Sequence, residues 1–383
     1  MSTVLEYVDP LEGFRGWLVY DGGSCRIAAG GCRVQQGLTR DTLVSLASRM
    51  TLKERLLGIN VDGAKCGIDY DPRSPGKAAA VRRFLAFLRE ELVHRFSMGS
   101  DMGTRWDELE RLAAAEGIPS IKYAVRRAQE FTDDEFFARL RTLQAPVGAL
   151  TLAQRRAGHA LAEAAVGAAR AAGLGPRATC ALQGFGNLGR AAACTLAEVG
   201  MTVVAVSDEF GCVADHHGLD IPGMLAAPFG TPVQASVRRG EQLPSTALFK
   251  IPADISILAA TENAISLPQV GELPTPVVVV GANCGLTPDV EAALDRAGVL
   301  VIPDFVGGIG GSASVEALFG PEHRPTEVHV LGGVTQIMRQ LVDHLISEAR
   351  RRGTSARSVA LHLAQTTIPV PDRRPYGRSR FLA

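Results

Sequence analysis

The sequence has few aromatic residues, few lysines and no excess of charge of either sign. Aromatic residues make up 5% of its 383 residues, and Lys plus Arg balances Asp plus Glu at 40 each. Such a balance produces no overall field that would attract nucleic acid or anionic lipid. The apolar fraction of 46% is normal for a globular protein and argues against a disordered chain. We therefore expect neither a nucleic-acid partner nor a membrane partner.

Long apolar runs and paired cysteine motifs are also missing. The longest apolar stretches, such as residues 277–281, have strand length and are far too short for a membrane span. The N-terminus lacks the basic segment and apolar run of a signal peptide. The seven cysteines are scattered, odd in number and without CxxC spacing, which favours reduced thiols over disulfides or a zinc site. We expect a cytoplasmic protein without a metal site.

The length and the hydrophobic pattern predict two domains. In the N-terminal part, residues 15–33 read as one or two strands, and helical periodicity follows at 39–57, 76–96, 105–116 and 133–143. Pro146 and Gly148 then interrupt two helical stretches, which is typical of a hinge. An Ala-rich helix at 151–172 ends before Gly173, which favours a left-handed cap.

From residue 178 onward strands alternate with helices, which predicts a parallel sheet covered on both faces. The expected strands are 178–183, 201–207, 254–259, 276–281 and 299–302, with helices at 190–199 and 287–297. Two further helices are expected at 328–349 and 354–364. The final residues, rich in Pro and Arg, are expected to form a mobile tail.

A glycine-rich segment follows the first of these strands and opens a helix. It consists of Gly184, Phe185, Gly186, Asn187, Leu188 and Gly189. The first glycine permits a tight turn, the second lets the backbone approach a pyrophosphate, and the third permits close helix–strand packing. Asp208 ends the next strand, where its carboxylate can bind the adenosine ribose and would repel a 2′-phosphate. The alternative is a turn without a ligand and a surface aspartate. The order of the elements predicts an NAD site, with NADP not excluded.

Lysine is rare among the basic residues, with five in the chain, at positions 53, 65, 77, 122 and 250. A desolvated ammonium can give up its proton near neutral pH, whereas a guanidinium cannot, so a lysine here can mark a catalytic base. Lys53 lies in a predicted helix, and Lys65 lies in the glycine-rich segment 62–67, which we expect to be a turn. Asp101 lies in a turn before a helix. Taken singly, the lysines are equally compatible with solvated surface charges, and Asp101 is more typical of a helix N-cap.

Seven motifs in order give the sequence a resemblance to a known family. They are Gly30-Gly31-Cys32-Arg33, Met50 to Lys53, Gly63-Ala64-Lys65, Asp101 to Thr104, Gly184 to Gly189, Gly281-Ala282-Asn283, and Ile302-Pro303-Asp304 followed by Gly310-Gly311. Over residues 15–350 the chain resembles the glutamate/leucine/phenylalanine/valine dehydrogenase family, and most closely its leucine and phenylalanine branch. The resemblance implies NAD(P)-dependent oxidative deamination of an L-amino acid, or the reverse reductive amination.

The resemblance also implies an architecture and a set of partners. It implies an α/β fold with an N-terminal substrate and oligomerisation domain at 1–147, completed by a C-terminal helix at about 335–365. A Rossmann-type dinucleotide-binding domain at 148–334 would follow, with the active site in the cleft. The implied partners are an amino acid or 2-oxo acid, ammonia, and further copies of the chain in a homo-oligomer.

Matched positions imply roles for individual residues. Lys53 would bind the substrate α-carboxylate, Lys65 would activate water for attack on the imine, and Asp101 would exchange protons with the substrate nitrogen. Hydride would pass from the substrate α-carbon to the nicotinamide. Asn283 is expected to contact the nicotinamide ribose, and Ala260 is expected to join the cofactor contacts.

The expected substrate is bulky and apolar or aromatic, and not glutamate. Glutamate-specific relatives have a lysine directly before the Gly30-Gly31 pair and a serine later in the chain. Ala29 and Val315 stand there in this sequence, and burying a side-chain carboxylate without a partner would cost several kcal/mol. The substrate pocket is expected to contain Ala29, Gly30, Gly31, Lys53, Gly99, Ser312 and Val315. The alternative is that neighbouring side chains fill the space at the small residues.

Three departures from the family pattern are visible. Gly148 stands where a threonine contacts the nicotinamide amide, with Thr151 a helical turn later, and Gly308 replaces an asparagine near the substrate amino group. Leu258-Ala259 replaces a Pro-Cys pair before a cofactor loop. These departures leave open a second hypothesis, a cofactor-binding homologue that has lost deamination. A hydroxy-acid dehydrogenase is disfavoured, because none of the eight histidines has a catalytic motif context.

Overall fold

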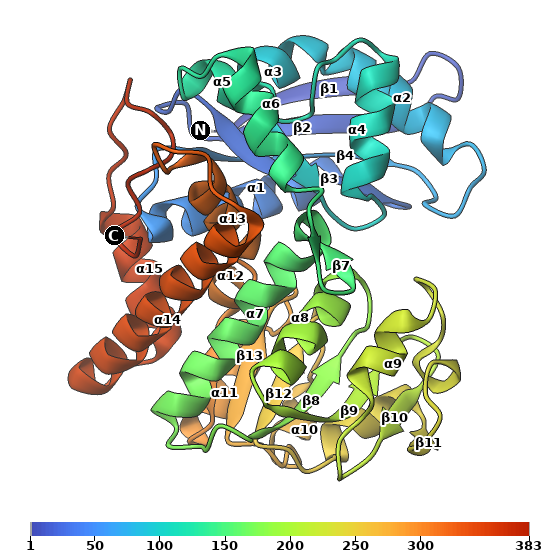
Figure 1. Cartoon of the computed structure of the whole chain (residues 1–383), viewed down its shortest axis with the longest axis vertical. Helices are drawn as coiled ribbons and strands as arrows, with labels where there is room; N and C mark the ends of the chain where they lie inside the picture. Colours follow the sequence, from blue (N-terminus) through green and yellow to red (C-terminus); the bar gives the residue numbers. More distant parts are fainter. Residues whose placement is uncertain (1, 383) are drawn as a thin grey trace. The chain divides into compact units, whose positions relative to one another are not determined.

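The computed structural model of the chain describes residues 2–382, which form two compact units (Figure 1). Unit 1 consists of Met1–Leu140, Leu318–Arg324 and Leu363–Arg380. Unit 2 consists of Arg141–Ala317, Pro325–His362 and Phe381–Ala383. Each unit has its own sheet, so the predicted two-domain α/β fold is confirmed.

Unit 1 is built on a sheet whose strand order, within the described residues, is β1-β2-β4-β3-β5. β1 pairs antiparallel with β2 and β2 antiparallel with β4, whereas β3 pairs parallel with both β4 and β5. The strands are β1 (Ser2–Val8), β2 (Arg15–Asp21), β3 (Ala28–Gln35), β4 (Asp62–Asp69) and β5 (Phe96–Ser100).

Helices cover both faces of this sheet. Helix α1 (Arg40–Leu57) begins at Thr39, whose side chain accepts from the Thr42 amide, and ends at Gly58 with φ +77°. Its Leu43 and Ala47 pack against Trp17 and Val19 of β2. The opposite face packs against a larger apolar core that includes residues of α2 (Lys77–Phe87), α3 (Arg89–His94) and α4 (Trp106–Ala115). Two helices follow, α5 (Ala124–Ala128) and α6 (Asp133–Thr142).

Unit 2 contains a sheet with the strand order β11-β10-β9-β8-β12-β13-β14 in the described part of the chain. β8, β9, β12, β13 and β14 are parallel, and β10 and β11 extend one edge through antiparallel pairs. The chain passes from β8 to β9 and later to β12 on the other side of β8, so the carboxyl end of β8 is a topological switch point. The strands are β8 (Thr179–Gln183), β9 (Thr202–Ser207), β10 (Cys212–Ala214), β11 (Glu241–Leu243), β12 (Ile255–Leu258), β13 (Val277–Val280) and β14 (Leu300–Ile302).

Helices and a short hairpin complete unit 2. The hairpin pairs β6 (Pro146–Val147) with β7 (Leu150–Thr151) through Gly148, which has φ +63°. The helices are α7 (Leu152–Ala171), α8 (Asn187–Glu198), α9 (Ile221–Ala226), α10 (Leu267–Val270), α11 (Pro288–Arg296), α12 (Asp304–Gly307), α13 (Gly310–Phe319), α14 (Glu327–Arg352) and α15 (Ala356–Thr366), with 3₁₀ turns at Val233–Ala235 and Ser245–Lys250. The predicted hinge therefore corresponds to a tight turn that leads into α7.

Helix α14 packs along α7 inside unit 2. A Cβ at Gly167 of α7 would lie 3.0 Å from Cγ1 of Val342, so the two helices approach closely at that glycine. Glu163 of α7 also pairs with Arg339 of α14 at 2.7 Å. These contacts assign residues 325–362 to unit 2, which differs from the expected use of residues 335–365 to complete the N-terminal domain.

Two expectations for individual segments are wrong. Lys65 lies inside strand β4 and not in a turn. The sequence did not indicate this strand because both of its faces are covered, so it shows no apolar–polar alternation. The C-terminal residues are not a mobile tail within the described range. Asn60 accepts from Val370 and donates to the carbonyls of Arg374 and Pro375, and the Tyr376 amide donates to Gln129. These hydrogen bonds, together with the contact between the rings of Tyr376 and Phe319, order the segment.

Candidate active site

The sequence-predicted catalytic residues lie on one face of the unit 1 sheet. Side chains alternate along a strand, and the register pairs Ala29 with Gly63 of β4 and with Ser97 of β5. Counting in steps of two from these pairs places Gly31, Lys65 and Asp101 on the same side. This is the face against which α1 packs, because Val19, the register partner of Lys65, belongs to the α1 cluster.

Asp101 is held by two cations. Its Oδ2 lies 2.9 Å from Nζ of Lys65 and 2.8 Å from Nε of Arg33. Burial alone would raise the pKa of the Asp101 carboxyl, but the charges and hydrogen bonds of Lys65 and Arg33 outweigh it and hold the pKa well below its usual range. Asp101 is therefore an ionised carboxylate at neutral pH. Arg33 is a site residue to which the motif reading gave no role, although its spacing from Gly31 places it on this face.

The turn after β5 fixes Asp101 to β3. The Asp101 amide donates to Oγ1 of Thr104, whose hydroxyl donates to the Cys32 carbonyl at 2.8 Å. Gly103 has φ +75°, and a Cβ there would lie 2.1 Å from the Val34 carbonyl oxygen. The aspartate, glycine and threonine of this motif therefore form one positioning unit for the carboxylate.

The glycines beside the cluster occupy their positions for different physical reasons. A Cβ at Gly30 would overlap the Ala64 carbonyl at 1.7 Å, so β3 and β4 can approach only with glycine there. A Cβ at Gly31 would lie 2.9 Å from Cβ of Asp101 and 3.3 Å from Nζ of Lys65. At Gly99 a Cβ would meet only the Gly30 carbonyl at 3.9 Å. Space therefore remains beside Gly99, whereas Gly30 and Gly31 are required by close neighbours.

Lys53 is buried in α1, the helix that packs on the face carrying Lys65. Thr51, two residues earlier, donates its hydroxyl to the Asp21 carboxylate at 2.7 Å and so ties the helix to β2. A Cβ at Gly63 would lie 2.4 Å from the Ala47 carbonyl oxygen, so the glycine lets α1 approach β4. The structure thus brings Lys65 and Asp101 into contact and buries Lys53 in the helix above their sheet.

In unit 2 the three glycines after β8 have the geometry that the sequence predicts. Gly184 has φ +94°, which suits a tight turn. Gly186 precedes α8, and a Cβ there would have no heavy atom within 4 Å, so the backbone stays accessible. A Cβ at Gly189 would lie 1.9 Å from the Gly184 carbonyl oxygen, which enforces close helix–strand packing. The amides at the start of α8 can therefore receive a pyrophosphate. Phe185 is buried, so its side chain serves packing.

Asp208 follows β9 and has structural partners. Its carboxylate accepts from the amides of Phe210, Gly211 and Val233, at 2.9, 3.0 and 2.7 Å. A carboxylate offers about four acceptor positions, so a ribose hydroxyl can still join. Ala260 lies against the glycine turn, since a Cβ at Gly184 would be 2.8 Å from Cβ of Ala260.

The loop that carries Asn283 is fixed by a buried carboxylate. The amide of Cys284, which has φ +55°, donates to Oδ2 of Asp304 at 2.9 Å. Arg357 of α15 donates to the other oxygen of Asp304 at 3.0 Å and also to Glu291 at 2.7 Å. The sequence analysis identified Asp304 only as part of a motif and assigned it no role. Arg357 carried no signal at all, because it lies in no motif and far along the chain.

The predicted pocket residues Ser312 and Val315 are buried on α13. A Cβ at Gly310 would lie 2.6 Å from Cβ of Ala160, so this glycine permits α13 to pack on α7. A Cβ at Gly311 would have no heavy atom within 4 Å. Thr151, near the position of the missing nicotinamide contact, caps α7 through a capping box with Gln154.

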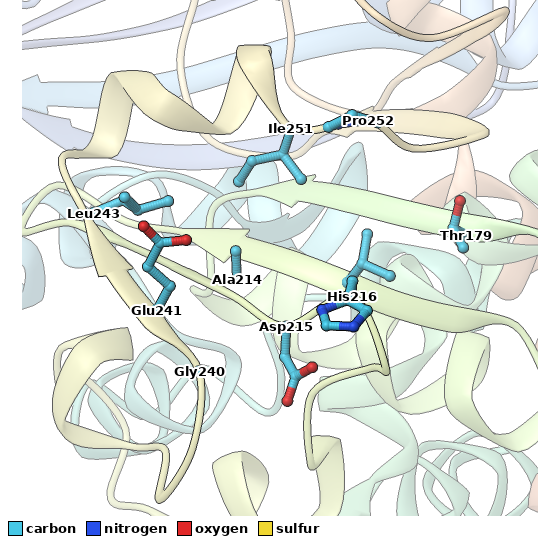
Figure 2. A pocket seen from close by; sticks show the side chains of 10 residues that line it. Thr179, Ala214, Asp215, His216, Gly240, Glu241, Leu243, Ile251 and Pro252 are labelled. Carbon is cyan, nitrogen blue, oxygen red and sulfur yellow. The ribbon is translucent and has the colours of Figure 1, made fainter.

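A separate pocket of about 720 Å³ lies in unit 2 (Figure 2). Thr179 begins β8 and Pro252 precedes β12, so the pocket lies at the amino ends of the parallel strands, away from the glycine turn. Asp215, His216 and Glu241 also line it, and it contains no predicted site residue. No helix within residues 2–382 combines the length and apolar composition that a membrane span requires.

Family models match most of the chain. The model described as Glu/Leu/Phe/Val dehydrogenase, dimerisation domain, matches residues 5–115. The model described as Glutamate/Leucine/Phenylalanine/Valine dehydrogenase matches residues 151–369, which is more than half of the chain. Together they cover the strands and turns that hold the lysine–aspartate cluster and the glycine turn.

Curated proteins and a solved structure give the same family. The chain is 28% identical to glutamate dehydrogenase of Aeropyrum pernix, covering 78% of this chain and 70% of the relative. It is 30% identical to NADP-specific glutamate dehydrogenase A1 of Halobacterium salinarum, covering 79% and 71%. The hetero-hexameric glutamate dehydrogenase of Thermus thermophilus, in a leucine-bound form, matches with a TM-score of 0.76 at 27% identity, covering 95% of this chain and 86% of that one.

These relatives carry the name glutamate dehydrogenase, so they support the family without supporting the leucine and phenylalanine branch that the motifs favour. The matched models, the two-unit fold and the lysine–aspartate cluster agree with one another. The chain therefore belongs to the Glutamate/Leucine/Phenylalanine/Valine dehydrogenase family and is an NAD(P)-dependent oxidoreductase of the amino acid dehydrogenase type.

Proposed function

We propose that the protein oxidatively deaminates an L-amino acid other than glutamate, or runs the reverse reductive amination, with NAD as its cofactor. One observation carries the proposal: a lysine ammonium and an ionised aspartate in contact on the sheet face against which α1 packs, Lys65 with Asp101. In the oxidative direction an L-amino acid, water and NAD⁺ would give a 2-oxo acid, ammonium, NADH and one proton.

The residues of unit 1 would have separate roles in the reaction. Lys53 binds the α-carboxylate and orients the substrate. Asp101 accepts a proton from the substrate ammonium and is held in place by Arg33 while its charge changes. Lys65 orients and polarises the water that attacks the imine carbon. Bound NAD would supply the hydride acceptor, and the hydride would come from the substrate α-carbon.

The cofactor site would use the carboxyl end of the unit 2 sheet. The backbone of Gly184, Gly186 and Gly189 with the first turn of α8 would hold the pyrophosphate. Asp208 would bind the adenosine ribose, with Ala260 beside the turn and Asn283 at the nicotinamide ribose. The fixed Asp208 carboxylate favours NAD because it would repel a 2′-phosphate, although the Halobacterium relative is NADP-specific.

The substrate side chain would be bulky and largely apolar or aromatic. Ala29 is half-buried, and a Cβ at Gly99 would meet one atom only, so both positions would leave room on the sheet face that carries Lys65. Ser312 and Val315 on α13 would contribute a hydroxyl and an apolar contact. We also propose that the chain forms a homo-oligomer, since its N-terminal part matches a dimerisation-domain model. Light scattering after size-exclusion chromatography tests this, and a monomer would refute it.

Absorbance at 340 nm with NAD⁺ and a panel of leucine, valine, phenylalanine, tyrosine, tryptophan and glutamate tests the activity. Lys65→Ala should abolish most of the turnover, because it removes the group that positions water. Lys250→Ala is the matched control, since this lysine is exposed at 75% and lies outside the site. Undiminished turnover in Lys65→Ala would refute its assigned role.

A second candidate follows from the two glycine departures. Gly308 offers no side chain where the family presents an amide, and its backbone amide donates to the Asp304 carbonyl. The protein would then bind cofactor without deaminating. NADH binding measured by fluorescence, together with no turnover across the amino acid panel in either direction, would favour this reading over the first.

A further inference from the structure

Two loops at the carboxyl end of the unit 2 sheet share an uncommon backbone conformation. Among residues 2–382, four non-glycine residues have a left-handed φ, and two of them are Asn263 at +50° and Cys284 at +55°. Asn263 lies in the loop after β12, and Cys284 lies in the loop after β13. Asparagine adopts this conformation more readily than most residues, whereas cysteine has no such preference. The surroundings of Cys284 therefore have to hold its backbone in place.

The two loops are hydrogen-bonded to each other. The Asn263 amide donates to the Cys284 carbonyl at 2.9 Å, and a second bond of 2.8 Å joins the next residue of each loop. The loop of Asn263 also contains Ala260, which lies against the first glycine of the turn at 184–189. A displacement of the Cys284 backbone would therefore disturb a loop that borders the glycine turn.

A carboxylate fixes the Cys284 amide, and an arginine of α15 fixes that carboxylate. Oδ2 of Asp304 accepts from the Cys284 amide at 2.9 Å. Arg357 donates to Oδ1 of Asp304 at 3.0 Å and to Glu291 of α11 at 2.7 Å. Its guanidinium also lies 5.2 Å from the centre of the Phe305 ring, in cation–π range. One side chain of α15 thus joins α11, α12 and the loop after β13.

The guanidinium of Arg357 is shared by two carboxylates that are almost fully buried. The side chains of Asp304 and Glu291 are 2% and 7% exposed. Burial raises the pKa of Glu291, although the charge of Arg357 opposes the rise. Without Arg357, these carboxylates would repel each other without their shared cation, which favours displacement of Asp304. A planar guanidinium can donate to both at once, whereas a lysine ammonium lacks this fork geometry.

We propose that Arg357 is a positioning residue for the dinucleotide, and that it acts through Asp304 to hold the backbone of Cys284 and the neighbouring Asn283 in the conformation that binds the nicotinamide half. The inference rests on the proposed cofactor contact of Asn283. It makes α15, which belongs to no sequence motif of the site, a determinant of cofactor affinity. Arg357 would not touch the cofactor, so it would affect cofactor affinity and leave the chemical step nearly unchanged.

Fluorescence titration with NADH, and with NADPH in parallel, tests this without any turnover. Arg357→Met should raise the Kd of the reduced cofactor by about 5- to 50-fold, because it removes a charged partner from a buried carboxylate. Arg357→Lys keeps the charge and should give a smaller rise. KM for the oxidised cofactor should rise in parallel, while kcat at saturating cofactor stays within about threefold. Arg339→Met is the matched control, since Arg339 also pairs with a buried carboxylate of unit 2, that of Glu163, and should leave the Kd unchanged.

A second substitution distinguishes positioning from a general loss of stability. Glycine adopts a left-handed φ without steric cost, so Cys284→Gly lets the loop keep its conformation with less support from Asp304. The double variant of Arg357→Met with Cys284→Gly should therefore bind the reduced cofactor more tightly than Arg357→Met alone. If Arg357→Met does not fold, Arg357→Gln replaces it in both comparisons.

Three results would overturn the inference. They are an unchanged Kd in Arg357→Met, an equal rise in Kd in Arg339→Met, and a rise that Cys284→Gly does not reduce. The titration also separates the inference from the proposed function. Weakened binding in Arg357→Met without turnover of any amino acid by the unmodified protein would refute the deamination and keep the inference. Turnover with a cofactor affinity independent of Arg357 would refute the inference and keep the deamination.

Discussion

Two clusters in this protein, each built around a carboxylate that pairs with an arginine, have similar compositions and different surroundings. In unit 1, Asp101 pairs with Lys65 and Arg33 on the face of a sheet. In unit 2, Glu163 pairs with Arg339 at 2.7 Å, and His159, one turn earlier in α7, contacts Oγ1 of Thr335 at 2.8 Å. Both clusters contain a buried carboxylate, and both perturb a pKa.

The difference lies in what borders each cluster. Gly31 and Gly99 stand beside the first, and space is left next to Gly99. The second lies between α7, α8 and α14, where His159 also contacts Oγ1 of Thr195 on α8 and Glu163 is buried, while the Arg339 side chain is 38% exposed. Strongly shifted pKa values are common at active sites, yet structural networks produce them too. Open space beside the charges is the better indicator of chemistry.

Removing the charge of Asp101 gives the largest expected effect. Asp101→Asn keeps the shape of the side chain but removes the proton acceptor, so kcat should fall by about 10²- to 10⁴-fold. Steady-state NADH formation measures the change, and circular dichroism checks that the fold persists. This variant should therefore lose activity while its fold is retained. A variant with near-normal kcat would remove the distinction between the clusters.

The cluster around Glu163 should respond in stability instead. Glu163→Ala leaves Arg339 and the Thr335 hydroxyl without their carboxylate partner, which should lower the free energy of unfolding by about 1–3 kcal/mol. Urea unfolding of purified protein measures it. Glu348→Ala on α14 is the control, because its pairs with Arg351 and Arg352 lie at the surface and should contribute much less to stability. Equal losses in both variants would contradict the assignment.

The sequence predicted unit 2 better than unit 1 for a physical reason. The turn at 184–189 follows a strand and opens a helix, and it combines φ +94° at Gly184 with close packing of Gly189 on Gly184, so the motif carries much of its own context. Strand β4 gives no such signal. Both of its faces are buried, and Gly63, Ala64 and Gly67 break the alternation that marks a strand, so Lys65 appeared to lie in a turn.

The site was predictable as a set of residues and not as an arrangement. The motifs named Lys65 and Asp101, and the structure places them in contact. The same motifs could not reveal that Arg33 shares Asp101 or that Arg357 positions the loop of Asn283 through Asp304, because those contacts join segments far apart in the chain. Tertiary pairing determines these contacts, and the local sequence pattern does not encode that pairing.

Acid should affect the two clusters in separate pH ranges. Burial lowers the pKa of His159 below its ordinary value, although the Glu163 carboxylate opposes the shift. The unfolded chain then binds a proton that the folded chain excludes, so stability falls as the pH drops below about 6.5, by at most about 1.4 kcal/mol per pH unit. The pKa of Asp101 is also lowered, so its contribution is lost only below about pH 4.

Melting temperatures between pH 8 and pH 5 test the first of these ranges. His159→Gln keeps a hydrogen-bonding side chain without a titrating ring, so its melting temperature should decline less than that of the unmodified protein over this range. Identical pH profiles for the two proteins would show that His159 is not the group responsible, and the two clusters would then differ in activity alone.

The smallest expected effect tests whether the space beside the first cluster is real. Gly99 does not have a positive φ, and a Cβ there would meet only the Gly30 carbonyl at 3.9 Å. Gly99→Ala should therefore change the free energy of unfolding by less than about 1 kcal/mol, and in the stabilising direction, because alanine restricts the unfolded chain. The added methyl group should still occupy the pocket and shift kcat/KM several-fold toward smaller substrates, measured as leucine against phenylalanine. Gly31→Ala is the contrast, since its Cβ would press on both Asp101 and Lys65 and should reduce turnover of every substrate. If Gly99→Ala left the substrate preference unchanged, the space beside Gly99 would not belong to the side-chain pocket, and the open surroundings of the catalytic cluster would need another explanation.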